Sequence, residues 1–318
     1  MIKKFLLLIF LLIVLISGGI FWLYQNTKSV SATKTFQNFL ITKGQSGASV
    51  ATKLQSAGLI KNALAFRIYV RLTGQSGKIQ AGEFRLSPSY SLFQTVDQLL
   101  SGPIEIWVTI PEGLRREEIA GRFATTLERD QTFINAFLAS SKGQEGYLFP
   151  DTYLFAKDAS ASAIVKKMAN TFDAKVANIV PNGTALTPKD LIILASILER
   201  ETKTNTERPI VAGILINRLE AGMPLQVDAS VQYAVGTSKN WWPILTRADL
   251  GINSKYNTYK FAGLPPSPIA SPGISSIMAS YNPTANDYWY YIHDDSGQIH
   301  YAKTLDEHNA NIRKYLGK

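Results

Sequence analysis

The chain has 318 residues, no cysteine and a formal net charge of +9. That length accommodates two domains plus an anchor, with a sizeable core. The lack of cysteine excludes disulfides, thiol catalysis and cysteine-ligated metal sites. The positive charge favours polyanionic or membrane surroundings, but no Lys/Arg run or nucleic-acid-binding motif accompanies it, so we expect no nucleic-acid partner.

An uncharged stretch of apolar and small residues, 5–24, follows Lys3 and Lys4. Its length predicts a single membrane-spanning helix. Because positive charge marks the cytoplasmic side, the two lysines predict a cytoplasmic N-terminus, with the rest of the chain outside the membrane. A cleaved signal peptide is the alternative, although no convincing A-x-A cleavage site follows the stretch.

Residues 25–35 are polar and small, which predicts a tether. Between 36 and 102, hydrophobic patterns and glycine stops predict a compact module. Strands are expected at 36–42 and 80–86, and helices at 48–57, 62–73 and 91–100. No catalytic constellation occurs here, so binding or spacing is the more plausible use of the module.

The remaining residues predict a mixture of helices and a few strands. A strand is expected at 104–110, a hairpin at 288–302, and helices at 115–127, 132–140, 164–179, 187–201, 206–219 and 307–316. Gln226 and Asp228 are expected on one face of an extended segment, lining a groove or flanking a surface strand. Trp241 and Trp242 suit stacking on a carbohydrate or, equally, a packed corner.

The most apolar of these helices begins at Thr187, a suitable cap, followed by Pro188 at the first helical position. Residues 191–198 are all apolar except Ser196. A helix that is apolar all round is normally buried. We therefore expect this helix at the centre of the domain core.

Two acids end this helix. On a helical wheel Glu201 projects into the apolar sector, whereas Glu199 projects well off its centre. Burial raises the pKa of a carboxyl group, so Glu201 is a candidate general acid. The alternative is a surface glutamate on the last turn, paired with Arg200 or Arg208.

The sequence contains none of the common catalytic or cofactor-binding motifs: it has no G-x-S-x-G, no phosphate-binding loop, no H-E-x-x-H and no G-x-G-x-x-G. The three histidines are His293, His300 and His308. The hairpin can bring the first two together, but with no clear third ligand we expect no metal site and no cofactor.

A series of motifs follows in fixed order. These are Leu194–Thr202 (L-A-S-I-L-E-R-E-T), Glu207–Arg208, Ile216–Leu219, Gly222–Met223, Leu225–Asp228, Tyr256–Tyr259, Gly263–Pro266 and Ile269–Gly273. With the short anchor and the module ahead of them, they resemble the YceG/MltG family of endolytic murein transglycosylases, over roughly residues 36–318.

The resemblance implies an α+β chain with three parts. Residues 1–30 would form the cytoplasmic end, the transmembrane anchor and the start of the tether; 36–103 a LysM-like α/β module; and 104–318 a YceG-like catalytic domain. It implies a bacterial inner-membrane enzyme that cleaves the β-1,4 bond between N-acetylmuramic acid and N-acetylglucosamine within peptidoglycan strands, leaving 1,6-anhydromuramyl ends. Penicillin-binding proteins or other cell-wall synthesis proteins are the implied partners.

The resemblance also assigns residues. The second glutamate of the family motif A-S-I-x-E-x-E-T is Glu201, which would act as general acid and then as base. Motif position makes further residues candidates for tuning its pKa, holding substrate groups or lining the groove: Glu199, Glu207, Gln226, Asp228, Tyr256, Asn257 and Tyr259.

Two alternatives stay open at this point. One is an ordinary glycoside hydrolase with Asp228 as a second carboxyl group working through water. The other is a non-catalytic membrane-anchored protein that binds glycan through the LysM-like module.

Overall fold

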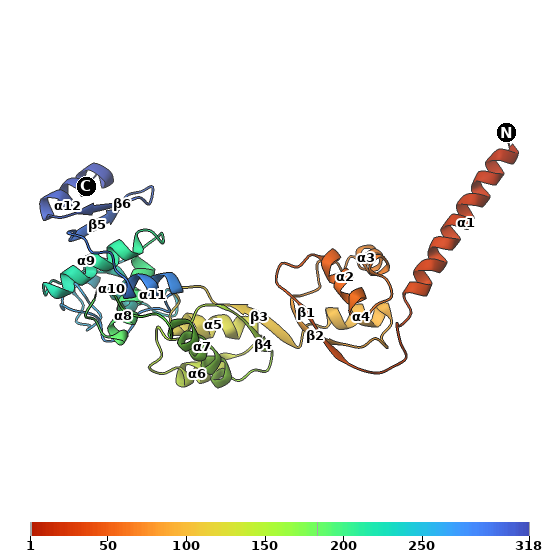
Figure 1. Ribbon diagram of the computed structural model, residues 1–318, viewed down its shortest axis with the longest axis horizontal. Helices are drawn as coiled ribbons and strands as arrows, with labels where there is room; N and C mark the ends of the chain where they lie inside the picture. Colours follow the sequence, from red (N-terminus) through yellow and green to blue (C-terminus); the bar gives the residue numbers. More distant parts are fainter. Residues whose placement is uncertain (1, 183, 318) are drawn as a thin grey trace. The chain divides into compact units, whose positions relative to one another are not determined.

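The computed structural model describes residues 2–182 and 184–317, with side chains from Leu6 onward. Met1 and Lys318, which bound the predicted domain ranges, lie outside the described residues, as do the side chains of Lys3 and Lys4 that carry the orientation prediction. The described chain is mixed α+β and divides into two compact units. One comprises the residues up to Val108 with Tyr153–Asp158, and the other comprises Thr109–Thr152 with the residues from Ala159 on (Figure 1).

The first helix, α1, spans Ile2–Asn26. Its part Leu6–Asn26 is long and apolar enough to cross a membrane, judged by length and composition. Its apolar side chains pack against little else; Leu15, for example, is 73% exposed. These features are consistent with a single-pass anchor.

The rest of the first unit combines a sheet with three helices. Its elements are β1 (Gln37–Ile41), α2 (Gly47–Ser56), α3 (Ala63–Leu72), β2 (Gly82–Leu86), α4 (Leu92–Leu100), β3 (Glu105–Thr109) and β4 (Thr152–Ala156). The sheet order is β1-β2-β3-β4, and β1–β2 and β2–β3 are antiparallel. The two strands and three helices predicted between 36 and 102 are confirmed to within two residues at each end, whereas β4 was not predicted. The likeness of this part to a LysM module stays a prediction.

The segment after α1 is packed against this module at its start. Thr27 is 6% exposed, and its carbonyl oxygen accepts a hydrogen bond from the Leu92 N–H at 2.9 Å. The N–H groups of Val30 and Ser31 both donate to the Pro88 carbonyl at 3.1 Å. Residues 27–31 are therefore held by hydrogen bonds, in contrast to the free tether predicted for 25–35.

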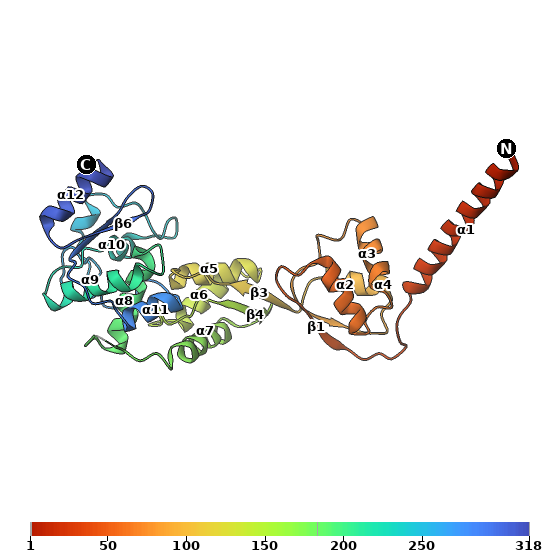
Figure 2. The same ribbon diagram turned by 45° about the horizontal axis from the view of Figure 1, so that its top comes forward.

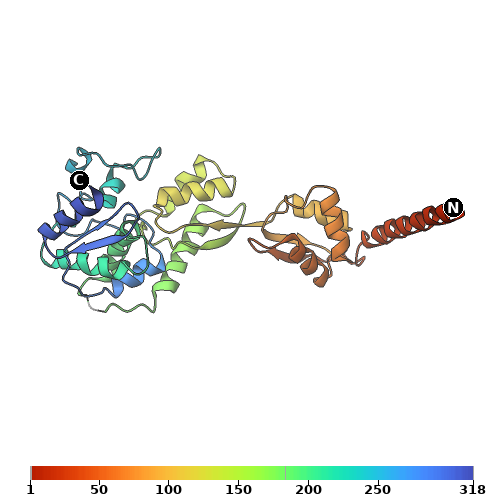
Figure 3. The same ribbon diagram turned by 90° about the horizontal axis from the view of Figure 1, so that it is seen from above.

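The second unit is mainly helical. Its elements are α5 (Arg116–Thr126), α6 (Gln131–Ser140), α7 (Ala161–Val176), α8 (Pro188–Glu201), α9 (Arg208–Glu220), α10 (Asp228–Val235), the short 3-10 helix η1 (Asp249–Gly251), α11 (Ile274–Tyr281), β5 (Tyr290–His293), β6 (Ile299–Ala302) and α12 (Leu305–Leu316). Figure 2 shows α8 beside α9 and α11. Figure 3 shows the β5–β6 hairpin with α12 alongside it.

The central helix α8 follows its sequence pattern closely. The Thr187 hydroxyl accepts from the Asp190 N–H at 3.2 Å, and Pro188 occupies the first turn. All residues from 191 to 198 are buried. Ser196, the polar exception, accepts from the Ile269 N–H at 3.0 Å and so ties α8 to a distant loop. The predicted buried helix is confirmed.

Two local predictions are wrong, and one further helix was missed. Helix α9 is capped at Glu207, not at Thr206. The segment expected to be extended turns at Gln226, whose φ is 53°, and Asp228 begins helix α10. Helix α11 was not predicted. Both missed helices are eight residues long, too short to show a clear helical period.

Candidate active site

A polar cavity of about 440 Å³ lies at the C-terminal end of α8. Residues from α8, α9, α10, α12, the 225–226 turn, the loop after η1 and strand β5 line it. They are Glu201, Arg218, Leu225, Gln226, Asp228, Tyr259, Tyr290, Tyr291, Ile292, Leu305 and His308. The structure thus brings four of the predicted site residues together: Glu201, Gln226, Asp228 and Tyr259.

Glu201 has the properties of a proton donor. Protein atoms crowd its carboxyl group, and this burial raises its pKa from 4.5 to about 7. The Tyr291 hydroxyl donates to Oε2 at 3.0 Å and opposes that rise, while the negative charge of Asp228 adds to it. Within the part of the chain that the structure describes, no lysine or arginine forms an ion pair with Glu201. The carboxyl group is therefore poised between its two protonation states near neutral pH.

Asp228 and Tyr259 form a second polar group on the same cavity. The Tyr259 hydroxyl donates to Asp228 Oδ1 at 2.6 Å. Burial and the neighbouring Asp228 carboxylate raise the pKa of Tyr259, so its hydroxyl stays protonated and available as a donor. Gln226 is exposed, with its N–H bonded to the Thr258 carbonyl at 3.0 Å, which leaves its side-chain amide free to meet a ligand.

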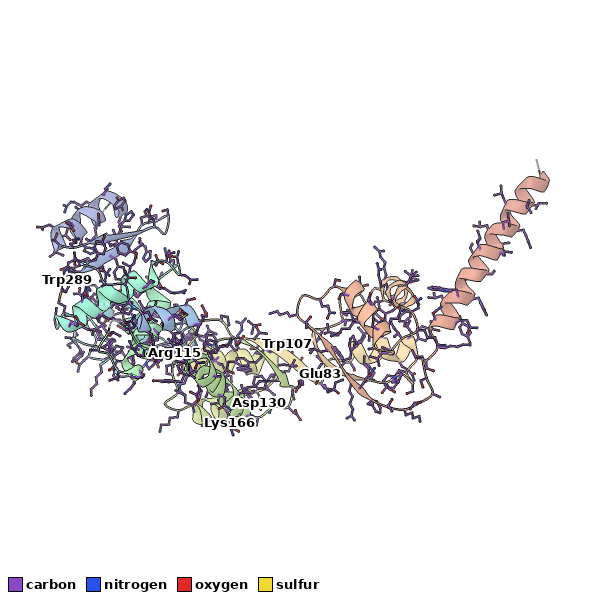
Figure 4. All side chains as sticks on the ribbon, viewed as in Figure 1. Glu83, Trp107, Arg115, Asp130, Lys166 and Trp289 are labelled. Atoms are coloured by element: carbon purple, nitrogen blue, oxygen red, sulfur yellow. The ribbon has the colours of Figure 1, made fainter. Side chains whose placement is uncertain are left out.

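Arg218 braces the cavity wall. Its Nε donates to the Trp289 carbonyl at 2.7 Å, and its Nη1 donates to the Leu225 carbonyl at 2.8 Å. Its guanidinium group also lies over the Tyr290 ring, 5.1 Å from the centroid. Trp289, labelled in Figure 4, begins the segment that carries Tyr290 and Tyr291 to the cavity. Arg218 therefore helps to fix the position of β5, the strand that supplies Tyr291, the hydrogen-bond partner of Glu201.

Glu199 lies outside the cavity lining, in a different environment. Its Oε1 pairs with Arg208 Nη2 at 3.1 Å, and its Oε2 accepts from the Gly273 N–H at 2.9 Å and the Ser276 hydroxyl at 2.7 Å. Its side chain is 7% exposed and therefore buried, although the helical wheel places Glu199 well off the centre of the apolar sector. Neighbouring helices cover α8 on several sides, so the carboxyl groups of Glu199 and Glu201 are both buried. The two acids differ in the groups that contact their carboxylates.

Glu207 also holds structure together. Its carboxylate accepts from the N–H groups of Lys203 and Thr204, and closes the turn between α8 and α9. Its Oε2 also lies 3.2 Å from His293 Nε2 on β5. Glu207 is 4% exposed and is not among the residues that line the cavity.

Tyr256 and Asn257 shape the loop that presents Tyr259. Asn257 is fully buried, and its side-chain amide donates to the Leu250 and Ile252 carbonyls, each at 2.9 Å. Its Oδ1 accepts from the Tyr259 N–H at 3.0 Å. The Tyr256 hydroxyl lies 2.7 Å from the Ser267 hydroxyl. Neither residue lines the cavity.

The two adjacent tryptophans take part in a packed corner. The Trp242 indole N–H donates to Glu118 at 3.0 Å, and the Arg200 guanidinium lies 3.9 Å from the Trp242 ring centroid. Arg115, labelled in Figure 4, lies over the Trp241 ring at 4.5 Å. These contacts favour the packing interpretation over stacking on a sugar.

A second buried acid, Glu145, shows that pKa alone does not select the site. Burial raises the pKa of Glu145 to about 8. Its carboxylate, however, accepts from the Tyr233 hydroxyl at 3.1 Å and from the Arg116 N–H at 3.2 Å, and Glu145 is not among the residues that line the cavity at the end of α8. Glu201, by contrast, lines that cavity.

The histidines do not form a metal site in the described part of the chain, where no group of three or more His, Asp or Glu side chains is placed to hold a metal ion. In the hairpin register His293 pairs with Ile299 and His300 with Ile292, so the two histidines lie on opposite faces. His300 instead bonds Asp294 at 2.8 Å and stacks on Tyr315.

Sequence reasoning missed Tyr291 and Arg218 as site residues. Tyr291 was identified only as part of a hairpin, and Arg218 only as part of a motif. The available signal was strand alternation, since Tyr291 and His293 share one face of β5 and both carry polar groups.

Comparisons with known proteins agree with this picture. A family model described as the YceG-like family matches residues 39–314. A Bacillus subtilis relative named endolytic murein transglycosylase is 34% identical over 313 residues, which cover 89% of this chain and 86% of the relative. A Streptococcus pneumoniae relative of the same name is 27% identical, over 99% of this chain and 66% of the relative. The 2.6 Å crystal structure of a YceG-like protein from Listeria monocytogenes aligns with a TM-score of 0.55 at 30% identity, over 87% of this chain and 99% of that one.

Proposed function

Because this chain belongs to the YceG-like family, we propose that it is an endolytic lytic transglycosylase of peptidoglycan. It cleaves the β-1,4 bond between N-acetylmuramic acid and N-acetylglucosamine within glycan strands and leaves 1,6-anhydromuramyl ends. The observation that carries the proposal is Glu201, a carboxyl group with a pKa of about 7 that faces a polar cavity of about 440 Å³.

In the first step, protonated Glu201 donates its proton to the glycosidic oxygen as the bond to the muramyl anomeric carbon breaks. The oxygen departs with the N-acetylglucosamine residue as its hydroxyl group. Positive charge develops on the muramyl ring, and Glu201 becomes a carboxylate beside it. The Tyr291 hydroxyl, 3.0 Å from Oε2, stabilises this carboxylate by donating to it.

In the second step, the Glu201 carboxylate takes the proton of the muramyl 6-hydroxyl. The 6-oxygen then bonds to the anomeric carbon of the same sugar, which closes the 1,6-anhydro ring and regenerates protonated Glu201. No water is consumed. One carboxyl group whose pKa lies near neutrality suits both transfers, because it gives up and regains a proton at similar cost.

Asp228, Tyr259 and Gln226 are the candidates for holding the sugars. Tyr259 and Asp228 already share a hydrogen bond at the cavity, and the amide of Gln226 is exposed there. Such donors and acceptors match N-acetyl and hydroxyl groups. Glu199, Glu207, Tyr256 and Asn257 would act indirectly, by holding the loops and helix ends around the cavity.

The membrane and protein partners complete the proposal. Helix α1 would anchor the enzyme in the bacterial inner membrane with its N-terminus in the cytoplasm and the catalytic unit outside. There it would terminate or trim nascent strands beside penicillin-binding proteins or other cell-wall synthesis proteins.

The test is product analysis of the full-length protein on uncrosslinked glycan strands in heavy-oxygen water. We expect muramyl ends that are lighter than the reducing end by one water and carry no heavy oxygen, because the 6-hydroxyl is the nucleophile. Mass spectrometry of the fragments gives both readouts at once.

The same experiment separates the alternatives. Reducing ends that contain heavy oxygen would establish a hydrolase, and the presence of Asp228 in the cavity makes that mechanism the main rival. Strands that bind the protein and stay intact would establish a non-catalytic glycan-binding protein.

A further inference from the structure

The junction between α1 and the module of the first unit is packed and hydrogen-bonded. Leu23, near the end of α1, packs against the module core, and Thr27 is buried. The Thr27 carbonyl accepts from the Leu92 N–H at the first residue of α4, and Pro88 accepts two further hydrogen bonds from residues 30 and 31. Figure 1 shows the end of α1 beside α4. If α1 spans a bilayer, the start of α4 must lie at its surface.

An exposed apolar patch continues from that point. Phe93, next to Leu92, is 43% exposed, and its ring meets the ring of Tyr69 at a centroid distance of 4.9 Å. Leu72 lies three positions after Tyr69, on the adjoining surface of α3, and is 78% exposed. Large apolar side chains this exposed and this close together mark an interaction surface.

The charge of the module indicates what the patch meets. Residues 28–108 contain nine Lys and Arg but three Asp and Glu. Lys28 lies over the Tyr24 ring at the end of α1, 4.8 Å from the centroid, and Arg71 adjoins Leu72 in the sequence. Asp97, the acidic residue of α4, lies one turn beyond Phe93, away from the α1 end. Basic side chains beside exposed aromatic and aliphatic groups suit an anionic lipid interface.

We propose that the module of the first unit rests on the bilayer, with Tyr69, Leu72 and Phe93 in the lipid interface and its basic side chains on anionic phospholipid headgroups. The inference rests on the anchor role of α1 in the proposed function. The module then supports the anchor at the membrane surface. Contact with the bilayer fixes the orientation of the module, which a flexible tether would not do.

The lack of native cysteine permits a direct test on the full-length protein in nanodiscs. Leu72→Cys and Phe93→Cys are each labelled with an environment-sensitive fluorophore. Ile104→Cys is the matched control, since Ile104 is 46% exposed and its N–H bonds the carbonyl of Glu83, at the end of the module away from α1 (Figure 4). Leu15→Cys reports on α1 itself.

In phosphatidylglycerol-containing nanodiscs we expect nitroxide-bearing lipids to quench the labels at 72 and 93 several-fold more than the label at 104, and aqueous iodide to quench them less. Equal iodide access at 72, 93 and 104, with the label at 15 inside the lipid, would overturn the proposal. Equal protection in purely phosphatidylcholine nanodiscs would overturn its anionic-lipid part. A label at 15 outside the lipid would overturn both the anchor and the proposal, while glycan cleavage, measured separately, would stand.

Discussion

Replacing Glu201 by glutamine is expected to reduce anhydro-end formation by about 10²–10⁴-fold, the contribution typical of a positioned general acid. Glutamine keeps the size of the side chain and can still accept from the Tyr291 hydroxyl, but it has no proton to give at neutral pH. Because the same group serves both proton transfers, we expect the loss at the upper end of that range. Turnover of defined glycan strands, followed by mass spectrometry of the products, measures it.

The matched control is Glu220→Gln on the exposed surface of α9, which should leave turnover unchanged. Strand binding by Glu201→Gln should also persist, because the substitution removes chemistry and not the cavity. Near-normal turnover in Glu201→Gln would contradict the assignment and would direct attention to Asp228.

Replacing Arg208 by methionine is expected to destabilise the second unit by about 3–5 kcal/mol, the usual cost of removing one partner of a buried ion pair. Glu199 would lose its cationic partner in a site where its side chain is 7% exposed. Its hydrogen bonds from Gly273 and Ser276 would persist but would not replace the ion pair with Arg208. Hydrogen exchange of the α8 amides reports the loss.

The exposed Arg247→Met is the control and should change stability little. Adding Glu199→Gln to Arg208→Met should recover part of the loss, since the unpaired charge is then gone. No recovery in the double variant would show that Arg208 stabilises by packing alone.

Local patterns predicted most of the helices and the core. The apolar run at 191–198, with Thr187 ahead of it, identified the buried helix, and glycine stops bounded the elements of the module. The family motifs pointed to Glu201. Each of these signals lies within a segment of about fifteen residues, the range over which hydrophobic periodicity is informative.

The partners of the two acids could not be predicted in the same way. Tyr291 reaches Glu201 from a strand ninety residues away, and Arg208 and Gly273 reach Glu199 from two different elements. Periodicity locates such elements but does not say what each one faces. A helical wheel also fails to separate two acids on a helix that its neighbours cover on several sides.

The turn at Gln226 illustrates a different limit. Its φ of 53° is uncommon for a residue other than glycine, and no glycine or asparagine in the sequence signals it. Tertiary contacts hold the turn, including the bond from the Gln226 N–H to Thr258. Both Gln226 and Asp228 still line the cavity, but as a turn and a helix start, not as one face of a strand.

The proposed mechanism needs one protonated carboxyl group, so the decisive measurement is the pH dependence of kcat/KM for anhydro-end formation. Because burial raises the pKa of Glu201 to about 7 and the acid form is the active one, kcat/KM should be flat at low pH and fall tenfold per pH unit above about 7. Tyr291→Phe, which removes a hydrogen bond that lowers this pKa, should move the fall to higher pH. A profile with both a rising and a falling limb, as a second essential carboxylate would produce, or a fall unmoved by Tyr291→Phe, would contradict the account.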